Sequence, residues 1–560
     1  MLRYISEIAV GFLLIVFSLQ LNIGGFLKTT AGRFLNSSAE KKTDDLNLSY
    51  IIIIVFSFVL FAVLLLFRVD TIPVPYHVDE AGMAYDAKSI VNYGVDRYLY
   101  KYPVYLINFG GGQSVLYAYL AALFFKLFGF SVLTVRLPAI TLSLISALIF
   151  VLTVRKEYGN VSSIIMAGLF CFLPFSIMHS RWGLDSYLLF PMMIISCSIF
   201  FRAVRTGNIW LYVFSGLSFG LTLYSYVLSY ILVPLFLSLS ILFLICTKQI
   251  KWRHLFAMGI PLFILAVPLL LLICVNSGLI GEIRTPFLSI PKLPIYRESE
   301  MNIKNFVNHL RFNRNNILYK LFITDGDPLN ANIKFGTLYY FSIPLIIWGV
   351  ILSAKNAAVS FREKRFSLDL MMLILLVSGV FKSLMLFETN IYRCCEIYIP
   401  LFYFLCIGIL TLYQKKKTAA AITGILFAVH FAFFYYGYMT DYPKEPVQPD
   451  MVVSVEDLKN ALEYVSAIDN DKIYISQQNY LWTILALDID PYTFNEKKES
   501  VGVYVKRFDR FQYTGYVSLD SIDHDAVYIC RDPREIYDIV ASFHFDSEKF
   551  NTIEVLHKPK

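Results

Sequence analysis

The sequence YIIIIVFSFVLFAVLLLF (residues 50–67), followed closely by TIPVPYHVDEAGMAYDAKSI (71–90), decides the class of fold. The first stretch carries no charge over 18 residues and is long enough to cross the hydrocarbon core of a bilayer as a helix. The second stretch places Asp79 and Glu80 shortly beyond the end of that span. A carboxylate pair at the edge of a bilayer points to chemistry at the boundary between lipid and water.

The composition indicates a polytopic membrane protein. Of the 560 residues, 57% are hydrophobic and only 16% are charged, and the mean hydropathy is +0.58. These values exclude an ordinary soluble protein. Apolar runs predict about twelve membrane spans. The runs are 8–27, 50–67, 137–154, 161–178, 186–201, 209–247 (two spans), 255–275, 335–354, 370–387, 397–413 and 418–440.

Clusters of lysine and arginine in short loops predict the orientation, because such loops stay on the cytoplasmic side. The clusters fall on alternate connections, at 155–156, 202–205, 248–253, 362–365 and 415–417, and Lys28, Arg33, Lys41 and Lys42 are expected on the same side. The remaining connections are expected outside: 68–136, 179–185, 276–334 and 388–396. The net charge of +7 comes mostly from the inside loops and gives no indication of a nucleic-acid partner.

The apolar stretch 114–128 would reverse every later assignment if it crossed the membrane. It is short and ends near Lys126, so we expect an interfacial or re-entrant helix, with a short true span as the alternative.

The chain is expected to have three parts. Residues 1–49 hold an extra span and a cytoplasmic loop, and residues 50–440 form the transmembrane catalytic domain. Residues 441–560 form a small extracytoplasmic α/β domain, which begins with the proline-marked linker DYPKEPVQPD (441–450). In this domain VSVEDLKNALEYVSAID reads as an amphipathic helix with Ser454 and Asp457 at its N-terminus, and 471–476 and 525–530 read as buried strands.

The predicted outer face collects acids and bases, and each has a second interpretation. Asp79 and Glu80 could be merely solvated, Lys101, Arg181 and Arg393 could be snorkelling anchors, and Gly110–Gly112 could be a turn. The intramembrane residues Lys382 and His430 could be paired within the bundle or functional. His77 with Asp79, or His179 with Asp185, could bind a divalent ion, although no zinc-type spacing or other metal site is evident.

Several motifs in order resemble those of the GT-C membrane glycosyltransferases, in particular glycosyltransferase family 39, the protein mannosyltransferase-like branch, and the related aminoarabinose transferases. The resemblance spans residues 50–413. The motifs are HVDEAGMAYDA (77–87), KYPVYL (101–106), LFGFSVLTVRLPAI (127–140), HSRWGLDSY (179–187) and NIYRCCEIYIP (390–400).

The resemblance implies a GT-C fold and a polyprenyl-phosphate sugar donor. Asp79 would be the general base with Glu80 as its neighbour, and Asp185, with Arg181 and His179 nearby, would belong to the acceptor and donor site. Lys101 and Arg393 would contact the lipid-linked phosphate. Tyr102 is a further candidate for binding the substrate or this phosphate. Tyr102 separates Lys101 from Pro103, whereas the family often has lysine next to proline, so this sequence departs from the pattern there.

The function expected from these arguments is inverting transfer of a hexose or pentose from the lipid phosphate to a hydroxyl group at the outer face of the plasma membrane. The acceptor would be a protein, a wall polymer or a glycolipid. Two other classes stay open: a transporter or flippase of a lipid-linked sugar, and a non-catalytic scaffold for envelope assembly. The sequence identifies no definite cofactor, and a divalent metal ion stays open.

Overall fold

The computed structural model describes residues 2–19, 48–73, 76–295, 306–324, 326–327, 329–332, 334–444, 451–517, 520 and 522–559. The predicted cytoplasmic residues Lys28, Arg33, Lys41 and Lys42 and most of the linker 441–450 lie outside this set. The chain forms two compact units. Unit 1 comprises Met1–Phe67, Ala139–Val267 and Glu298–Tyr442, and unit 2 comprises Arg68–Pro138, Pro268–Arg297 and Pro443–Lys560.

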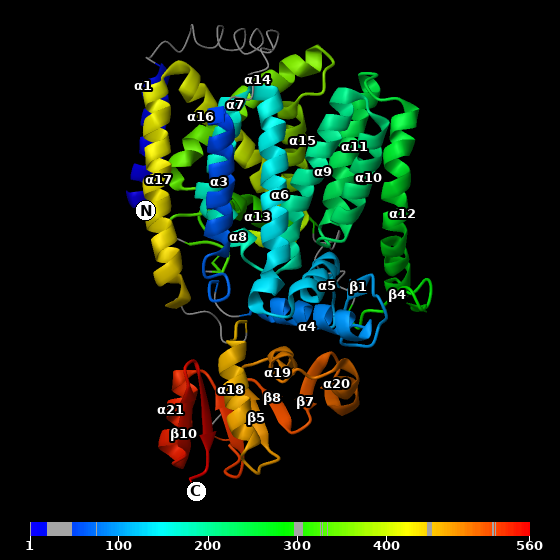
Figure 1. The fold of residues 1–560 in the computed structure, drawn as a ribbon, viewed down its shortest axis with the longest axis vertical. Coiled ribbons are helices and arrows are strands. Elements are labelled where there is room, and N and C mark those ends of the chain that lie inside the picture. Colours follow the sequence, from blue (N-terminus) through cyan, green and yellow to red (C-terminus); the bar gives the residue numbers. More distant parts are fainter. Residues whose placement is uncertain are drawn as a thin grey trace. The chain divides into compact units, whose positions relative to one another are not determined.

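Apolar helices dominate the chain (Figure 1). In the described residues, nine helices are long and apolar enough to cross a membrane, and the bent pair α7 and α8 could supply a tenth span. With the shorter helices α1 and α10, they occupy the segments in which spans were predicted. The chain is thus a multi-pass membrane protein, as predicted.

The apolar helices and the helices between them have the following bounds: α1 (Leu2–Leu19), α3 (Leu48–Leu66), α6 (Val132–Tyr158), α7 (Asn160–Phe172), α8 (Pro174–Ser180), α9 (Asp185–Thr206), α10 (Ile209–Leu223), α11 (Ser229–Cys246), α12 (Trp252–Asn276), α13 (Phe306–Phe322), η3 (Tyr340–Ser342), α14 (Ile343–Arg362), α15 (Leu368–Met385), η4 (Tyr392–Ile397), α16 (Tyr398–Lys415) and α17 (Lys417–Thr440). Helix α13 lies in the predicted outer loop 276–334, where no helix was expected.

Helix α16 is the central helix of unit 1, and its candidate membrane-spanning segment is completely buried inside the protein. Helix α14 approaches it closely at two glycines. A Cβ atom on Gly349 would lie 1.8 Å from the carbonyl oxygen of Phe404, and one on Gly408 would lie 2.4 Å from that of Leu345. Helices in lipid associate through such small residues, because no hydrophobic force drives them together.

The loop segments of unit 2 contain α4 (Val78–Tyr93), the strand pair β1 (Tyr105–Leu106) and β2 (Gln113–Ser114), helix α5 (Leu116–Phe128), and the pair β3 (Ile283–Arg284) and β4 (Ser289–Ile290). Helix α5 covers the stretch predicted not to cross the membrane. Its 13 residues give a length of about 20 Å, shorter than the hydrocarbon core. Its non-crossing placement stays a prediction.

The C-terminal part of unit 2 is built on a seven-stranded mixed sheet in the order β10-β11-β9-β5-β8-β7-β6, in which β5 pairs in parallel with β8 and β9. The predicted buried strands correspond to β5 and β9, and the predicted N-cap is confirmed, because the Ser454 hydroxyl accepts from the Asp457 N–H. The elements are η5 (Tyr442–Lys444), which precedes them, α18 (Val455–Ser466), β5 (Ile473–Ser476), α19 (Tyr480–Ala486), α20 (Pro491–Lys497), β6 (Lys498–Val501), β7 (Tyr504–Phe508), β8 (Phe511–Thr514), β9 (Val527–Cys530), α21 (Pro533–Phe543), β10 (Asp546–Phe550) and β11 (Ile553–His557).

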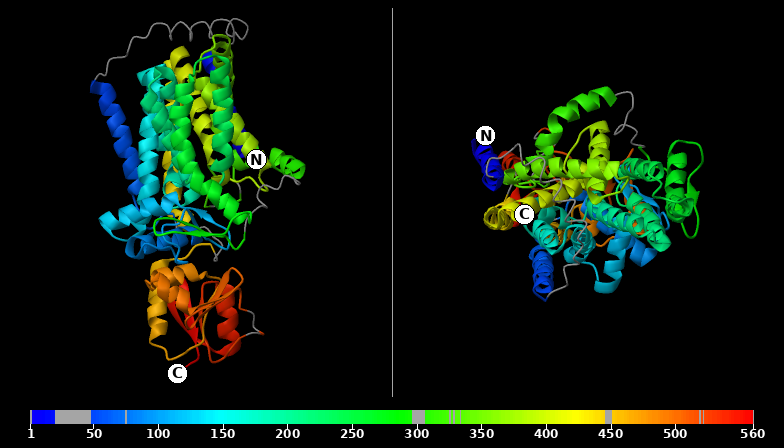
Figure 2. Two further views of the ribbon diagram at one scale, coloured as in Figure 1. Left: turned by 90° about the vertical axis from the view of Figure 1, so that its right-hand side faces the viewer. Right: turned by 90° about the horizontal axis from the view of Figure 1, so that it is seen from above.

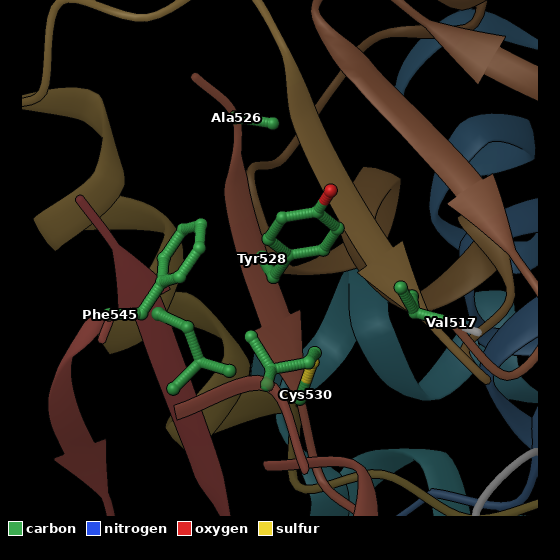
Figure 3. Packing of buried hydrophobic residues seen from close by; sticks show 7 residues of the cluster. Val517, Ala526, Tyr528, Cys530 and Phe545 are labelled. Carbon is green, nitrogen blue, oxygen red and sulfur yellow. The ribbon is translucent and has the colours of Figure 1, made fainter. Parts of the chain in front are cut away.

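Helices α18 and α21 lie on opposite faces of this sheet (Figure 2). On the α21 face, Ile539 packs with Tyr528, Cys530, Phe545 and Leu556 in a buried cluster (Figure 3). Because alternate residues of β9 point to opposite faces, both faces of this central strand are apolar. The predicted small α/β domain is therefore confirmed.

We predict that Gly349→Leu lowers the thermal-unfolding midpoint of the detergent-solubilised protein. The side chain would overlap the backbone of α16, and overpacking typically costs about 1–3 kcal/mol. Gly424→Leu on α17 is the matched control, since a Cβ atom there meets nothing within 4 Å. Equal midpoints for the two variants would contradict the close contact between α14 and α16.

Candidate active site

Asp79 and Glu80 lie in the first turn of α4, where the partial positive charge of a helix N-terminus favours carboxylates. His77 caps this end, because its Nδ1 accepts a hydrogen bond from the Asp79 N–H at 3.2 Å. Successive residues of a helix point about 100° apart. The two adjacent carboxylates therefore meet different surroundings.

Glu80 is completely buried in an ion pair with Arg136 of α6. The Nε and Nη2 atoms of Arg136 donate to the two carboxylate oxygens at 2.8 and 2.9 Å. Its Nη1 donates to the carbonyl oxygens of Val69 and Pro73 at 2.6 and 3.1 Å. Arg136 belongs to the quoted LFGFSVLTVRLPAI motif, but this pairing was not inferred from the sequence.

Asp79 remains accessible, with 38% of its side chain exposed. The Nδ2 of Asn108 donates to its Oδ1 at 2.7 Å, and its Oδ2 lies 3.7 Å from His77 Nδ1. Asn108 was not identified from the sequence, because a single asparagine in a loop carries no recognisable pattern. The acidic pair thus consists of one buried, paired carboxylate and one carboxylate that can meet a ligand.

Lys101 and Tyr102 are exposed in the same unit. Lys101 forms a backbone bridge with Val95, and the Tyr102 N–H donates to the carbonyl oxygen of Gly94. The nearby Gly110 has a φ of +73° and its carbonyl oxygen accepts from Ile295. These features fit the turn interpretation of the glycine run.

Arg181, in unit 1, is buried against the end of α3. Its Nη1 donates to the carbonyl oxygens of Leu64 and Leu65 at 2.7 and 3.1 Å, and its Nη2 donates to that of Phe67 at 2.8 Å. The last carbonyls of a helix have no partner within the helix. Arg181 therefore caps the helix that precedes the acidic motif in the chain.

His179 is buried, with its ring between those of Phe175 and Tyr187 at centroid distances of 4.0 and 3.8 Å. Within the described part of the chain, neither of its ring nitrogens has a hydrogen-bond partner. Asp185 begins α9 and is 8% exposed, and its Oδ1 accepts from the Ser186 N–H at 2.9 Å. Through Tyr187, the structure therefore brings His179 into contact with α9, the helix that begins at Asp185.

Arg393 lies in η4, and its Nη1 donates to the carbonyl oxygen of Glu388 at 3.3 Å. Beneath it, Lys382 forms a fully buried ion pair with Glu396 at 2.7 Å and also donates to the Arg393 carbonyl oxygen. The intramembrane lysine is thus paired within unit 1. Lys382 and Glu396 hold the backbone that carries Arg393.

The predicted site residues are divided between the units: Asp79, Glu80, Lys101 and Tyr102 belong to unit 2, and His179, Arg181, Asp185 and Arg393 belong to unit 1. Among the residues that the structure describes, no group of three or more His, Cys, Asp or Glu side chains is arranged to hold a metal ion.

A second buried ion pair lies further along α4, where Arg97 Nη2 contacts Asp86 at 2.6 Å. Asp96 is also buried, and its Oδ1 accepts from the backbone N–H groups of Tyr98 and Tyr100 at 2.9 Å. Burial, and secondarily the negative charge of Asp86, raise the pKa of Asp96 to about 7. Burial lowers the pKa of the nearby Lys498, and the negative charge of Asp96 partly offsets this effect.

We predict that removing the Glu80 charge destabilises the protein. Glu80→Gln would leave the buried Arg136 without its counter-charge, and breaking one side of a buried pair typically costs about 3–5 kcal/mol. The thermal-unfolding midpoint should fall far more than for Glu282→Gln, whose pair with Arg284 is solvent-exposed. A midpoint equal to that of the Glu282 variant would exclude a structural role for the pair.

We also predict a pH dependence caused by Asp96. Because its pKa is raised in the folded state, the folded protein binds the proton more tightly than the unfolded chain. This contribution to stability is greatest below pH 4 and falls, by up to about 1.4 kcal/mol per pH unit, as pH rises to about 7. Asp96→Asn should therefore gain stability relative to the native protein between pH 5 and pH 8, measured by thermal unfolding. A constant difference would contradict the raised pKa.

Comparison with known proteins supports the resemblance drawn from the motifs. The model of the dolichyl-phosphate-mannose-protein mannosyltransferase family matches residues 113–275. No protein in the search of curated sequences gives a significant match. The family match and the membrane fold together support a general glycosyltransferase role of GT-C type.

Among solved structures, the chain is similar to ArnT from Cupriavidus metallidurans bound to undecaprenyl phosphate. The TM-score is 0.51 at 12% identity, over 91% of this chain and 99% of ArnT. The apo form of ArnT gives the same values. An oligosaccharyltransferase from Archaeoglobus fulgidus gives a TM-score of 0.46 at 12% identity, over 78% of this chain and 63% of that protein. The chain therefore has the fold of the GT-C membrane glycosyltransferases, and its residues 113–275 match the mannosyltransferase model of glycosyltransferase family 39.

Proposed function

We propose that this protein transfers a sugar from a polyprenyl-phosphate donor to a hydroxyl group of an acceptor, with inversion at the sugar carbon and with Asp79 as the general base. The observation that carries the proposal is the contrast between Asp79 and Glu80. Only Asp79 is exposed to a ligand, and Asn108 and His77 hold it in place. The matched family and the undecaprenyl phosphate bound to ArnT support a lipid-phosphate donor.

In the proposed reaction, Asp79 removes the proton from the acceptor hydroxyl as its oxygen attacks C1 of the donor sugar. The bond between C1 and the phosphate oxygen breaks, and its electron pair leaves with the phosphate. A phosphate is a weak base, so cations that stabilise its charge suffice and no general acid is needed. One carboxylate is enough for a single displacement.

The cationic partners differ in what they can offer a phosphate. Lys101 is exposed, and Arg393 is partly exposed and donates to the carbonyl oxygen of Glu388. We assign the phosphate contacts to these two residues. Arg181 already donates to three carbonyl oxygens, so we assign it a supporting role at the end of α3. His179 and Asp185 are assigned to binding of the acceptor or donor sugar.

We place this reaction at the outer face of the plasma membrane, on the basis of the basic loops that alternate along the sequence. The identities of the sugar and the acceptor depend on the shape and chemistry of the pocket that binds them. Similarity of fold does not determine these properties.

We predict that Asp79→Asn abolishes sugar transfer while leaving lipid binding intact. Loss of a general base typically lowers a rate by about 10²–10⁴-fold. Cells carrying this variant, or lacking the gene, should accumulate a polyprenyl-phosphate sugar by mass spectrometry, and the purified variant should still bind undecaprenyl phosphate. Asp70→Asn, at an exposed acid of the same loop, is the matched control and should behave as the native protein.

Two results would overturn the proposal. Normal transfer by the Asp79 variant would exclude the base, and a transporter or scaffold would give this result. An unchanged profile of lipid-linked sugars and envelope glycans in cells without the gene would exclude the transferase itself.

A further inference from the structure

The segment that leads into α4 pairs with the start of the C-terminal domain, more than 370 residues later in the chain. His77 and Val452 form an antiparallel bridge. The Val78 N–H donates to the Met451 carbonyl oxygen at 2.9 Å, and the Val453 N–H donates to the Tyr76 carbonyl oxygen at 3.3 Å. The start of the C-terminal domain is therefore joined by an antiparallel bridge to the residues that immediately precede Asp79.

Two further side chains of the C-terminal domain fix this pairing. The fully buried Trp482 of α19 donates its Nε1–H to the Tyr76 carbonyl oxygen at 3.1 Å. On the other strand, Arg531 donates from Nη1 to the Val452 carbonyl oxygen. The Tyr76 carbonyl oxygen thus accepts two hydrogen bonds, and both donors come from the C-terminal domain.

The same domain also contacts the middle and the end of α4. Tyr85 donates its hydroxyl to the Ile489 carbonyl oxygen at 2.7 Å, and Lys88 pairs with Asp488 at 2.5 Å. Gly82 leaves no room for a side chain, since a Cβ atom there would lie 2.9 Å from Arg97 and 3.2 Å from Leu481. Helix α4 is therefore held along its length, and its first turn cannot shift without breaking backbone hydrogen bonds.

We propose that the C-terminal domain is a positioning element of the active site, in which Val453 and Trp482 hold the His77 cap and thereby aim the Asp79 carboxylate. This inference rests on the proposed function for the role of Asp79. The chain of contacts is continuous: Trp482 and Val453 hold Tyr76, the bridge to Val452 holds His77, and His77 holds the Asp79 N–H. None of these C-terminal residues touches the carboxylate, so their effect is on its orientation.

Positioning matters because a displacement of about 1 Å from the reactive geometry can reduce a rate by about 10²-fold. The strand pairing acts on the backbone directly before the helix, which sets the direction of the first-turn side chains. The domain would then be required for transfer although it contains no proposed reacting group.

The test compares two proline substitutions, two residues apart, in the full-length protein. Val453→Pro removes the N–H that donates to Tyr76. Val455→Pro introduces the same ring at the first residue of α18, a position that tolerates proline because its N–H has no partner within the helix. We expect hydrogen exchange at residues 76–81 to be at least about tenfold faster in the first variant, because the Val78 N–H loses its neighbouring strand, and unchanged in the second.

Sugar transfer in cells should fall by about 10- to 100-fold for Val453→Pro, with binding of undecaprenyl phosphate to the purified protein retained. Trp482→Phe tests the same contact without changing the backbone, because it keeps an aromatic ring but loses the N–H donor together with part of the buried ring volume. Its matched control is Tyr464→Phe, which loses a hydrogen bond to His557 elsewhere in the same domain. We expect reduced transfer and faster exchange at 76–81 for Trp482→Phe and native values for Tyr464→Phe.

Two outcomes would overturn the inference. In the first, Val453→Pro and Trp482→Phe both show native exchange at residues 76–81, or both show native transfer. In the second, the controls Val455→Pro and Tyr464→Phe lose as much transfer as these two variants. Failure of the proposed function gives a different result, namely an active Asp79→Asn variant.

Discussion

The buried ion pair between Glu80 and Arg136 is the constraint on which the proposed site depends. Neither charge has access to water, and such a pair is tolerable only when the remaining donors and acceptors are also satisfied. Arg136 meets this condition with two backbone carbonyls of the segment that precedes α4. The first turn of α4 is thereby fixed to the start of α6, and the adjacent Asp79 is directed to another, more exposed environment.

This arrangement separates two roles that look identical in the sequence. Two neighbouring acids at the end of a span could share a proton, bind a cation or act singly. Because both oxygens of Glu80 are bonded to Arg136, Asp79 is the carboxylate of the pair that a ligand can reach. The hydrogen bond from Asn108 occupies Oδ1 and leaves Oδ2 as the freer oxygen. The buried Glu80 therefore fixes the helix, and the accessible Asp79 beside it is the carboxylate proposed as the base.

Much of the fold followed from the sequence because it rests on local patterns. Apolar runs marked the spans, Ser454 and Asp457 marked the start of α18, and two short stretches interpreted as buried strands marked β5 and β9. Helix α13 was missed, since its sequence FVNHLRFNRNNILYKLF is polar for a helix of a membrane protein. The compact units also cut across the expected domains, because residues 68–138 associate with the C-terminal domain.

The candidate site was only partly predictable, for a physical reason. Asp79 and Glu80 were recognisable by type and place, whereas the partners that distinguish them depend on tertiary contacts. Arg136 and Arg181 lie in similar surroundings in the sequence, near the ends of apolar helices. One pairs with a carboxylate and the other with three carbonyls, and only the structure reveals which acceptors lie nearby. The pairing of Tyr76 with Val453 uses backbone atoms, which every residue possesses, so no residue pattern marks it.

The hydrogen bonds that a cation already makes also affect how well it could bind the leaving phosphate of the proposed reaction. A guanidinium has five donors in a rigid fork, and one that already holds three buried carbonyls, as Arg181 does, must break hydrogen bonds in a dry environment before it can bind an anion in the bidentate manner. Lys101 does not meet this obstacle, since its side chain is exposed. Lys382 forms a fully buried ion pair with Glu396 and also donates to the Arg393 carbonyl oxygen, so it is committed to the structure of this segment. Two buried pairs thus lie next to proposed site residues: Glu80 with Arg136 beside Asp79, and Lys382 with Glu396 in the segment that carries Arg393.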